Sequence, residues 1–125
     1  MGRVFISGGK GGLARAVAAH FSAAGWAVDA PSRAELDVGD CSAVEEWFAG
    51  RPAYDLAVCA AGVTKDRPFL KQTEDEWDAV MGVNARGAAW CARCAAAGML
   101  REGREGQVVM IGSYAAYRPA PSQAA

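Results

Sequence analysis

Residues 3–14, RVFISGGKGGLA, combine a short apolar run, four glycines within five positions and the start of a helix-forming stretch. The run Arg3–Ser7 is typical of a buried strand that glycine ends. Helix formers dominate from Gly12 to Ala24, and Gly25 follows where helices commonly end. The stretch therefore predicts a strand, a glycine-rich loop and a helix in direct succession.

The glycine-rich loop lies where a phosphate group can bind. Free backbone N–H groups and the positive end of the helix dipole meet there, and glycine lets the backbone approach a pyrophosphate closely. Lys10 precedes the last two glycines and no Gly-Lys-Ser or Gly-Lys-Thr occurs, which disfavours an ATPase or GTPase. Dinucleotide binding is the leading interpretation, and a plain strand-to-helix turn is the alternative.

The rest of the chain continues the alternation of strands and helices. Further strands are expected at Trp26–Ala30, Glu35–Val38, Tyr54–Ala61 and Gly106–Ile111, and further helices after Asp40 or Ser42, from the capping box at Thr73, and from Asn84 to about Leu100. Uniformly apolar strands between helices predict a parallel sheet with right-handed crossovers. The predicted fold class is α/β, a doubly wound parallel sheet, with five strands in the order 3-2-1-4-5 and incomplete at the C-terminal side.

Composition fits one globular domain. The 125 residues are 52% hydrophobic and 22% charged, with a net charge of -1. This balance gives no reason to expect nucleic acid or an anionic membrane as a partner. No apolar run approaches the roughly 18 residues of a membrane span, and the N-terminal run is too short for a signal peptide. We expect a cytoplasmic protein.

The cysteines offer no clear metal site. Cys91 and Cys94 form a C-x-x-C pair, but no second pair follows, and the only histidine is the distant His20. Both cysteines lie in an Ala-rich helical stretch, where small buried thiols are ordinary packing. We expect no metal.

The loop resembles that of the short-chain dehydrogenase/reductase family, whose pattern is Thr-Gly-x-x-x-Gly-x-Gly. Ser7 stands for the threonine, Gly8 and Gly12 match, and Ala14 replaces the last glycine. Further segments follow in the family's order: Leu36–Val38 at its Asp-Val, Cys59–Gly62 at its Asn-Asn-Ala-Gly, Val83–Gly87 at its Val-Asn-x-x-Gly, and Val109–Ser113 at the strand before its catalytic serine. The segment Gly62–Asn84 is close to 3-oxoacyl-[acyl-carrier-protein] and acetoacetyl-CoA reductases. The resemblance implies a Rossmann-like fold.

Two departures from the family pattern stand out. Cys59 and Ala60 replace both asparagines of Asn-Asn-Ala-Gly and cannot supply their side-chain hydrogen bonds. The family's Tyr-x-x-x-Lys, about a dozen residues after the serine, is absent, because Tyr114 is followed by Arg118 and Tyr117 by Pro121. The sequence therefore resembles the N-terminal half of a reductase, and residues 1–125 are expected to form its NAD(P)-binding domain.

The resemblance assigns roles to individual residues. Ser113 would hydrogen-bond the substrate oxygen, and Asn84 would shape its helix and hold a water. Strand end and helix N-cap are the respective structural alternatives. Asp37 would meet the adenine ring, or serve only as a turn acid or cap. The residues expected to bind the cofactor are Ser7, Gly8, Gly9, Lys10, Gly11, Gly12, Leu13, Ser32, Arg33, Asp37, Val38, Cys59, Ala60, Ala61 and Gly62.

Cofactor choice depends on the residues after the second strand. An acid there would bind the ribose 2′-OH of NAD, whereas a basic residue accommodates a 2′-phosphate. Ser32 occupies the acid's position and Arg33 follows it, with Lys10 in the loop. NADP is therefore favoured over NAD. The alternative is that Arg33 and Lys10 are solvated surface charges with no role in cofactor binding.

Two main hypotheses of function remain open. The first is an NADP-dependent oxidoreductase, homo-oligomeric at full length, that transfers hydride to a 3-oxoacyl-like carbonyl, this chain being inactive alone. The second is a naturally short, non-catalytic dinucleotide-binding or regulatory module. A weaker third hypothesis is a nucleotide-sugar reductase or epimerase, which residues 32–37 suggest. The resemblance of residues 62–84 to 3-oxoacyl and acetoacetyl-CoA reductases argues against it.

Overall fold

The computed structural model describes all of residues 1–125 and contains one sheet of four parallel strands. The strands are β1 (Arg3–Ile6), β2 (Ala27–Asp29), β3 (Leu56–Cys59) and β4 (Gln107–Met110). They are ordered β2-β1-β3-β4, with Phe5 opposite Asp29 and Ala57. The parallel α/β prediction is confirmed. The chain passes from β1 to β2 on one side and later to β3 on the other side of β1, and ligands bind outside the carboxyl ends of the strands at such a switch point.

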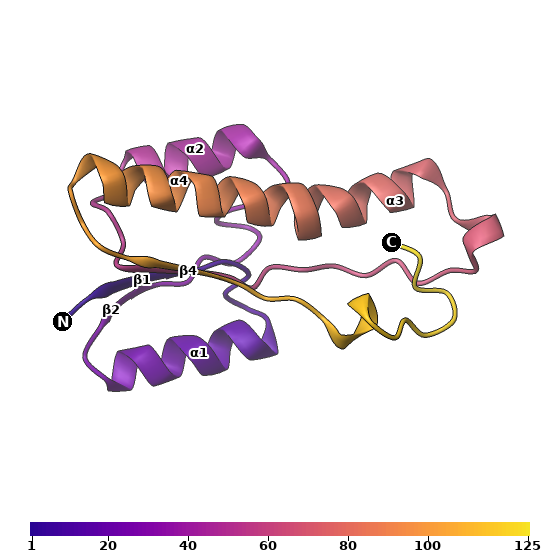
Figure 1. The fold of residues 1–125 in the computed structure, drawn as a ribbon, viewed down its shortest axis with the longest axis horizontal. Coiled ribbons are helices and arrows are strands. Elements are labelled where there is room, and N and C mark those ends of the chain that lie inside the picture. Colours follow the sequence, from indigo (N-terminus) through magenta and orange to yellow (C-terminus); the bar gives the residue numbers. More distant parts are fainter.

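The chain has four α-helices, three of which cover the sheet. They are α1 (Gly12–Ala23), α2 (Cys41–Ala49), α3 (Glu74–Met81) and α4 (Ala88–Arg101). Figure 1 shows α1 on one face of the sheet and α2 with α4 on the other. Thr73 and Glu76 form the predicted capping box of α3, and Asp40 caps α2 by accepting the Ser42 and Ala43 N–H groups at 3.0 and 3.2 Å.

The core has two layers because strand residues alternate between faces. Val4 and Ile6 face α1, whereas Phe5 belongs to the cluster beneath α2 and α4. The Phe5 ring meets Phe48 edge-on, with centroids 4.8 Å apart. Cys91 and Cys94 are buried in the same cluster, as expected of packing thiols, and Cys59, which was expected at the cofactor, is buried there too.

The predicted strand at Glu35–Val38 is wrong. The Leu36 N–H donates to the Ser32 carbonyl at 2.8 Å, and the Asp37 carboxylate accepts the Gly39 N–H at 2.9 Å. These two turns bend the segment, so Leu36 and Val38 reach the core from a loop and the sheet has four strands instead of five.

The predicted helix from Asn84 to Leu100 also begins differently. A π-helical turn, Gly82–Gly87, joins α3 to α4, so the two form one continuous helical segment, visible at the top of Figure 1. A Cβ on Gly87 would lie 2.7 Å from the Val38 carbonyl oxygen. Glycine at this position therefore serves close packing and does not separate two helices.

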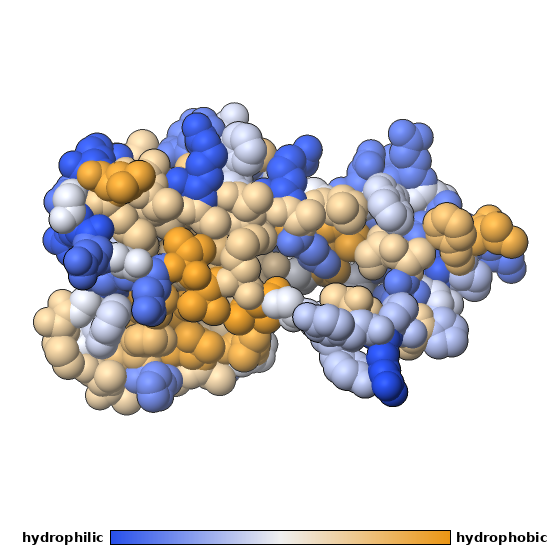
Figure 2. All heavy atoms as spheres, in the orientation of Figure 1, coloured by the Kyte–Doolittle hydropathy of each residue, from blue (hydrophilic) through white to orange (hydrophobic).

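Strand β4 lies at an open edge of the sheet. Val109 is 41% and Met110 55% exposed. Figure 2 shows hydrophobic residues gathered between α1 and α4, where this strand lies. An exposed apolar edge is a template for pairing with another strand. None of the helices combines the length and the apolar character that crossing a membrane requires.

Candidate functional site

The first half of the glycine-rich loop is fixed by packing against neighbouring strand ends. Gly8 has a φ of +71°, and a Cβ there would lie 2.8 Å from the Cα of Ala61. The Gly9 N–H donates to the Pro31 carbonyl at 2.8 Å, and its Cβ would lie 1.9 Å from the Ala30 oxygen. The fold itself therefore requires glycine at both positions.

The second half of the loop faces open space. The Gly11 N–H donates to the Gly8 carbonyl at 2.8 Å, which closes the turn. Helix α1 then begins at Gly12 with no side chain capping it, and a Cβ on Gly12 would meet no atom within 4 Å. The first N–H groups of α1 thus have no side-chain acceptor, and the absence of a side chain on Gly12 leaves open space beside them. Free N–H groups next to open space at a helix N-terminus are suited to bind an anion.

Ser7 locks the loop to the end of β3. Its hydroxyl oxygen accepts the N–H groups of Ala60 and Ala61, both at 3.0 Å. Ser7 is 2% exposed, so it holds the loop in place and does not itself face the open space of the site.

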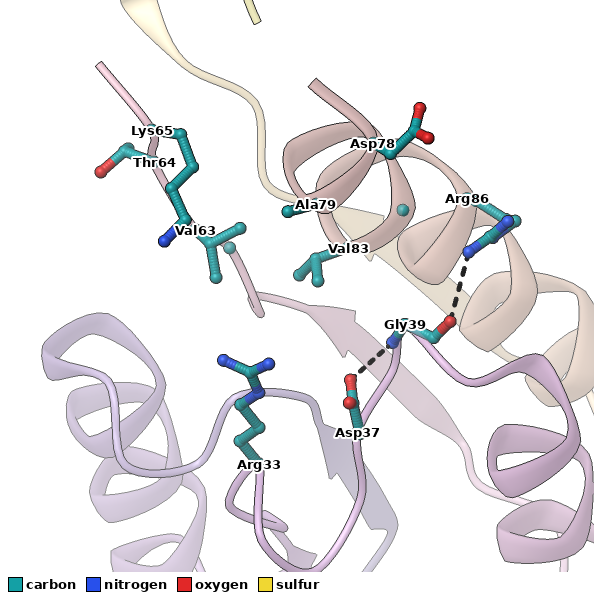
Figure 3. Close-up of a pocket in the computed structure, with 12 residues that line it drawn as sticks. Arg33, Asp37, Gly39, Val63, Thr64, Lys65, Asp78, Ala79, Val83 and Arg86 are labelled. Carbon is teal, nitrogen blue, oxygen red and sulfur yellow. Dashed lines mark hydrogen bonds between the residues drawn. The ribbon is translucent and has the colours of Figure 1, made fainter. Parts of the chain in front are cut away.

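Two adjoining cavities follow the carboxyl edge of the sheet. The smaller, of about 210 Å³, extends from Gly8 and Lys10 to Val83, and the larger is of about 670 Å³. Arg33 and Asp37 line both. Figure 3 shows the larger cavity, with Arg33 pointing into it from the β2 side. The two cavities form one trough that starts at the glycine-rich loop.

The charges along the trough differ in how they are held. The Asp37 carboxylate is tied to the Gly39 N–H, as its turn-acid interpretation predicted, yet it still lines the trough. Lys10 and Arg33 form no ion pair or hydrogen bond within the chain. Ser32 is buried and engages Glu35, and its backbone and side-chain hydrogen bonds lower the pKa of that carboxyl. Lys10 in the smaller cavity and Arg33, where the two cavities meet, are therefore unpaired cations of the trough.

A third cavity, of about 320 Å³, brings Asn84 and Ser113 together. The Asn84 carboxamide accepts the Val63 N–H and donates to the Val63 carbonyl, both at 2.8 Å. It lies in the π-helical turn and is not the helix N-cap of the structural alternative. Ser113 follows β4 and its oxygen accepts the Ala115 N–H at 3.1 Å. Val63 and Thr64 line this cavity and the large one, so all three are contiguous.

The structure brings most of the predicted site residues together. Those that line the trough are Gly8, Lys10, Gly11, Arg33, Asp37, Val38, Ala60, Ala61 and Gly62. Those that do not are Ser7, Gly9, Gly12, Leu13, Ser32 and Cys59. Among these, Gly12 and Leu13 are exposed at the start of α1, whereas Cys59 turns into the core.

Cys59 serves packing in this structure. Its thiol donates to the Ala88 carbonyl at 3.5 Å, and burial raises the pKa of this thiol to about 11. The side chain faces α4, on the side of the sheet away from α1.

Sequence reasoning missed several lining residues, namely Gly39, Val63, Lys65, Val83 and Arg86. A usable signal existed for Val63, because it directly follows the end of β3 and ligands bind beyond the carboxyl ends of parallel strands. For Arg86 no signal existed, since the π-helical turn that places it was not predicted.

The chain is similar to known oxidoreductases. The sequence model of the enoyl-(acyl carrier protein) reductase family matches residues 12–125. A short-chain dehydrogenase/reductase, prx4, of Penicillium rubens is 30% identical over 93% of this chain and 42% of its own length. L-xylulose reductase of Mesocricetus auratus is 31% identical over 93% and 54%. The chain thus spans about half the length of these curated relatives.

A solved structure shares the fold. The 4-hydroxyisoleucine dehydrogenase complexed with NADH superposes with a TM-score of 0.92 at 21% identity, over 99% of this chain and 61% of that one.

Proposed function

Because this chain belongs to the short-chain dehydrogenase/reductase family, we propose that it is the cofactor-binding half of an NADP-dependent oxidoreductase acting on a 3-oxoacyl-like carbonyl. One observation carries this proposal. A contiguous row of cavities leads from the glycine-rich loop, past two unpaired cations, to Asn84 and Ser113. When bound, the nicotinamide would supply the hydride.

The residues at the loop fit a dinucleotide. The uncapped start of α1 offers backbone N–H groups to a pyrophosphate, and Gly12 leaves room for it. Lys10 and Arg33 flank the smaller cavity without internal partners, so a 2′-phosphate would satisfy both. These features support NADP over NAD.

Ser113 and Asn84 would act in different ways. The Ser113 oxygen accepts a hydrogen bond from the Ala115 N–H, which leaves its own O–H free to donate to a substrate oxygen. Both ends of the Asn84 carboxamide are occupied by the Val63 backbone. Asn84 is therefore proposed as a positioning residue that holds the segment between the large cavity and the Ser113 cavity.

The proton donor is proposed to lie after Ala125, in the family's Tyr-x-x-x-Lys. Gln123 and Ala125 already line the cavity of Ser113 and Asn84, so residues that follow them would begin at this cavity. Without that pair, residues 1–125 lack the group that moves the proton. We further propose that the whole protein is a homo-oligomer that pairs through α4, whose exposed residues include Ala89 and Ala97.

The test is a steady-state assay of the whole protein with NADPH and an acetoacetyl thioester, beside a small ketose suggested by the L-xylulose reductase match. Ser113→Ala should lower kcat by about 100-fold or more, as does removal of one oxyanion donor. Ser22→Ala, on the exposed side of α1, is the matched control and should change nothing. An unchanged kcat for Ser113→Ala would overturn its role.

A second result separates the catalytic from the non-catalytic hypothesis. The reading frame after Ala125 should encode Tyr-x-x-x-Lys, and residues 1–125 alone should oxidise no NADPH. A stop codon in its place, or activity of the 125-residue chain, would contradict the proposed function.

A further inference from the structure

The large cavity carries a cation that the cofactor loop does not account for. Lys65 lines this cavity, forms no ion pair, and comes from the segment after β3. In Figure 3 its side chain extends along the wall that faces Arg33. Two unpaired cations therefore lie on opposite walls of one cavity of about 670 Å³.

The other charged side chains of the cavity are either held against the Gly39 backbone or turned away. The Arg86 guanidinium donates to the Gly39 carbonyl at 3.4 Å, and the Asp37 carboxylate accepts the Gly39 N–H. The Asp78 carboxylate points away from Arg33 and Lys65 in Figure 3. Neither acid forms an ion pair with Lys65 or Arg33. The cations Arg33, Lys65 and Arg86 outnumber the acids Asp37 and Asp78 around the cavity, which favours an anion there.

The backbone on both sides of Lys65 is anchored. Val63 is held by the Asn84 carboxamide, and the Arg67 N–H donates to the Ser122 carbonyl at 3.0 Å. The Arg67 guanidinium also pairs with Glu76 at 2.8 Å. The backbone at Lys65 is thus held in place, while its four-carbon side chain is flexible and ends in an ammonium group with three N–H donors. A lysine of this kind can reach and bind a phosphate.

We propose that Lys65 is a specificity-determining residue that binds the 2′-phosphate of the cofactor from the wall opposite Arg33. This inference rests on the proposed function and extends it, because it places one contact on a segment outside the glycine-rich loop and the residues after β2. Arg33 lines both cavities, whereas Lys10 lines only the smaller one and Lys65 only the larger one, so a phosphate beside Arg33 would have a lysine available from either cavity.

Adenosine bisphosphates test the proposal without activity as a readout. The probes are adenosine 2′,5′-bisphosphate, adenosine 3′,5′-bisphosphate and adenosine 5′-monophosphate, titrated by calorimetry into the protein. Lys65→Gln should weaken the 2′,5′-bisphosphate by about 10-fold, the usual value of one charge-assisted contact, and leave the monophosphate unchanged. Lys65→Arg should restore most of the affinity. Lys71→Gln, on the same segment but outside all three cavities, is the matched control.

The outcomes separate this inference from the proposed function. Equal weakening of bisphosphate and monophosphate by Lys65→Gln, or no weakening, would overturn the role of Lys65 while leaving cofactor binding intact. If the 3′,5′-bisphosphate binds as tightly and with the same dependence on Lys65, the 2′-phosphate assignment is overturned. If the unmodified protein binds none of the probes, the proposed function itself fails.

Discussion

Replacing Gly12 by alanine separates what the glycine-rich loop does for the fold from what it does for a ligand. A Cβ on Gly12 meets no protein atom within 4 Å, so the free energy of unfolding should stay within about 1 kcal/mol, as expected of Gly→Ala in a helix. The same methyl enters the space beside the first N–H groups of α1. Loss of one or two charge-assisted hydrogen bonds there should weaken NADPH by roughly 10- to 100-fold.

The matched variant is Gly9→Ala, whose Cβ would lie 1.9 Å from the Ala30 oxygen. Backbone must move to admit it, so this variant should lose about 1–3 kcal/mol of stability or more. Urea unfolding followed by circular dichroism measures the first quantity, and NADPH fluorescence titration measures the second. A Gly12→Ala chain that binds NADPH within twofold of the unmodified chain would refute the phosphate-binding role of this loop.

Three further predictions follow from the same structure. Arg33→Asp should shift the ratio of NADPH to NADH affinity by about 10-fold or more toward NADH, because it replaces the cation proposed for the 2′-phosphate with an acid; an unchanged ratio in calorimetry would make Arg33 a surface charge only. Burial and the hydrogen bond to Asp29 raise the pKa of Tyr54 from its ordinary 10.0 to about 12. Since the folded chain holds this proton more tightly, Tyr54 contributes stability that is fully present below pH 10 and is lost as the pH rises toward 12. In urea unfolding, Tyr54→Phe should lower the free energy of unfolding by about 1–2 kcal/mol at neutral pH, and this free energy should then fall less between pH 10 and 12 than in the unmodified chain. An equal fall in both chains would contradict the raised pKa of Tyr54. The 125-residue chain should self-associate at micromolar concentration through β4, and Val109→Lys should reduce that association in sedimentation velocity, whereas a chain that is monomeric without the substitution would exclude this interface.

Local sequence predicted the glycine-rich loop because its signals are local. Glycines between an apolar run and a helix can be read without knowledge of the rest of the fold, and so can the capping box at Thr73. The structure confirms the position of both elements. The same reasoning located Arg33 beside the loop, since it counts residues from Gly25 at the end of the first helix.

The predictions that proved wrong depended on partners distant in sequence. Two apolar residues around Asp37 suit a strand, but a strand needs a neighbour, and here turns bring Leu36 and Val38 to the core without one. A separate helix was predicted to begin at Asn84, yet the chain stays helical from α3 through the π-helical turn Gly82–Gly87 into α4, with Gly87 packed against the Val38 carbonyl. The direction of Cys59 was also undetermined, because a strand covered on both faces has apolar residues on each.

The central claim is that the carboxyl edge of this sheet binds NADP through the start of α1 and the cations of the trough. Amide chemical shifts of the 125-residue chain, recorded by NMR during titration with NADP⁺, test it most directly. The account predicts saturable shifts at Gly11, Gly12 and Leu13 together with Arg33 and the segment from Val63 to Lys65. No saturable shift, or shifts confined to β4 and the outer side of α1, would contradict it.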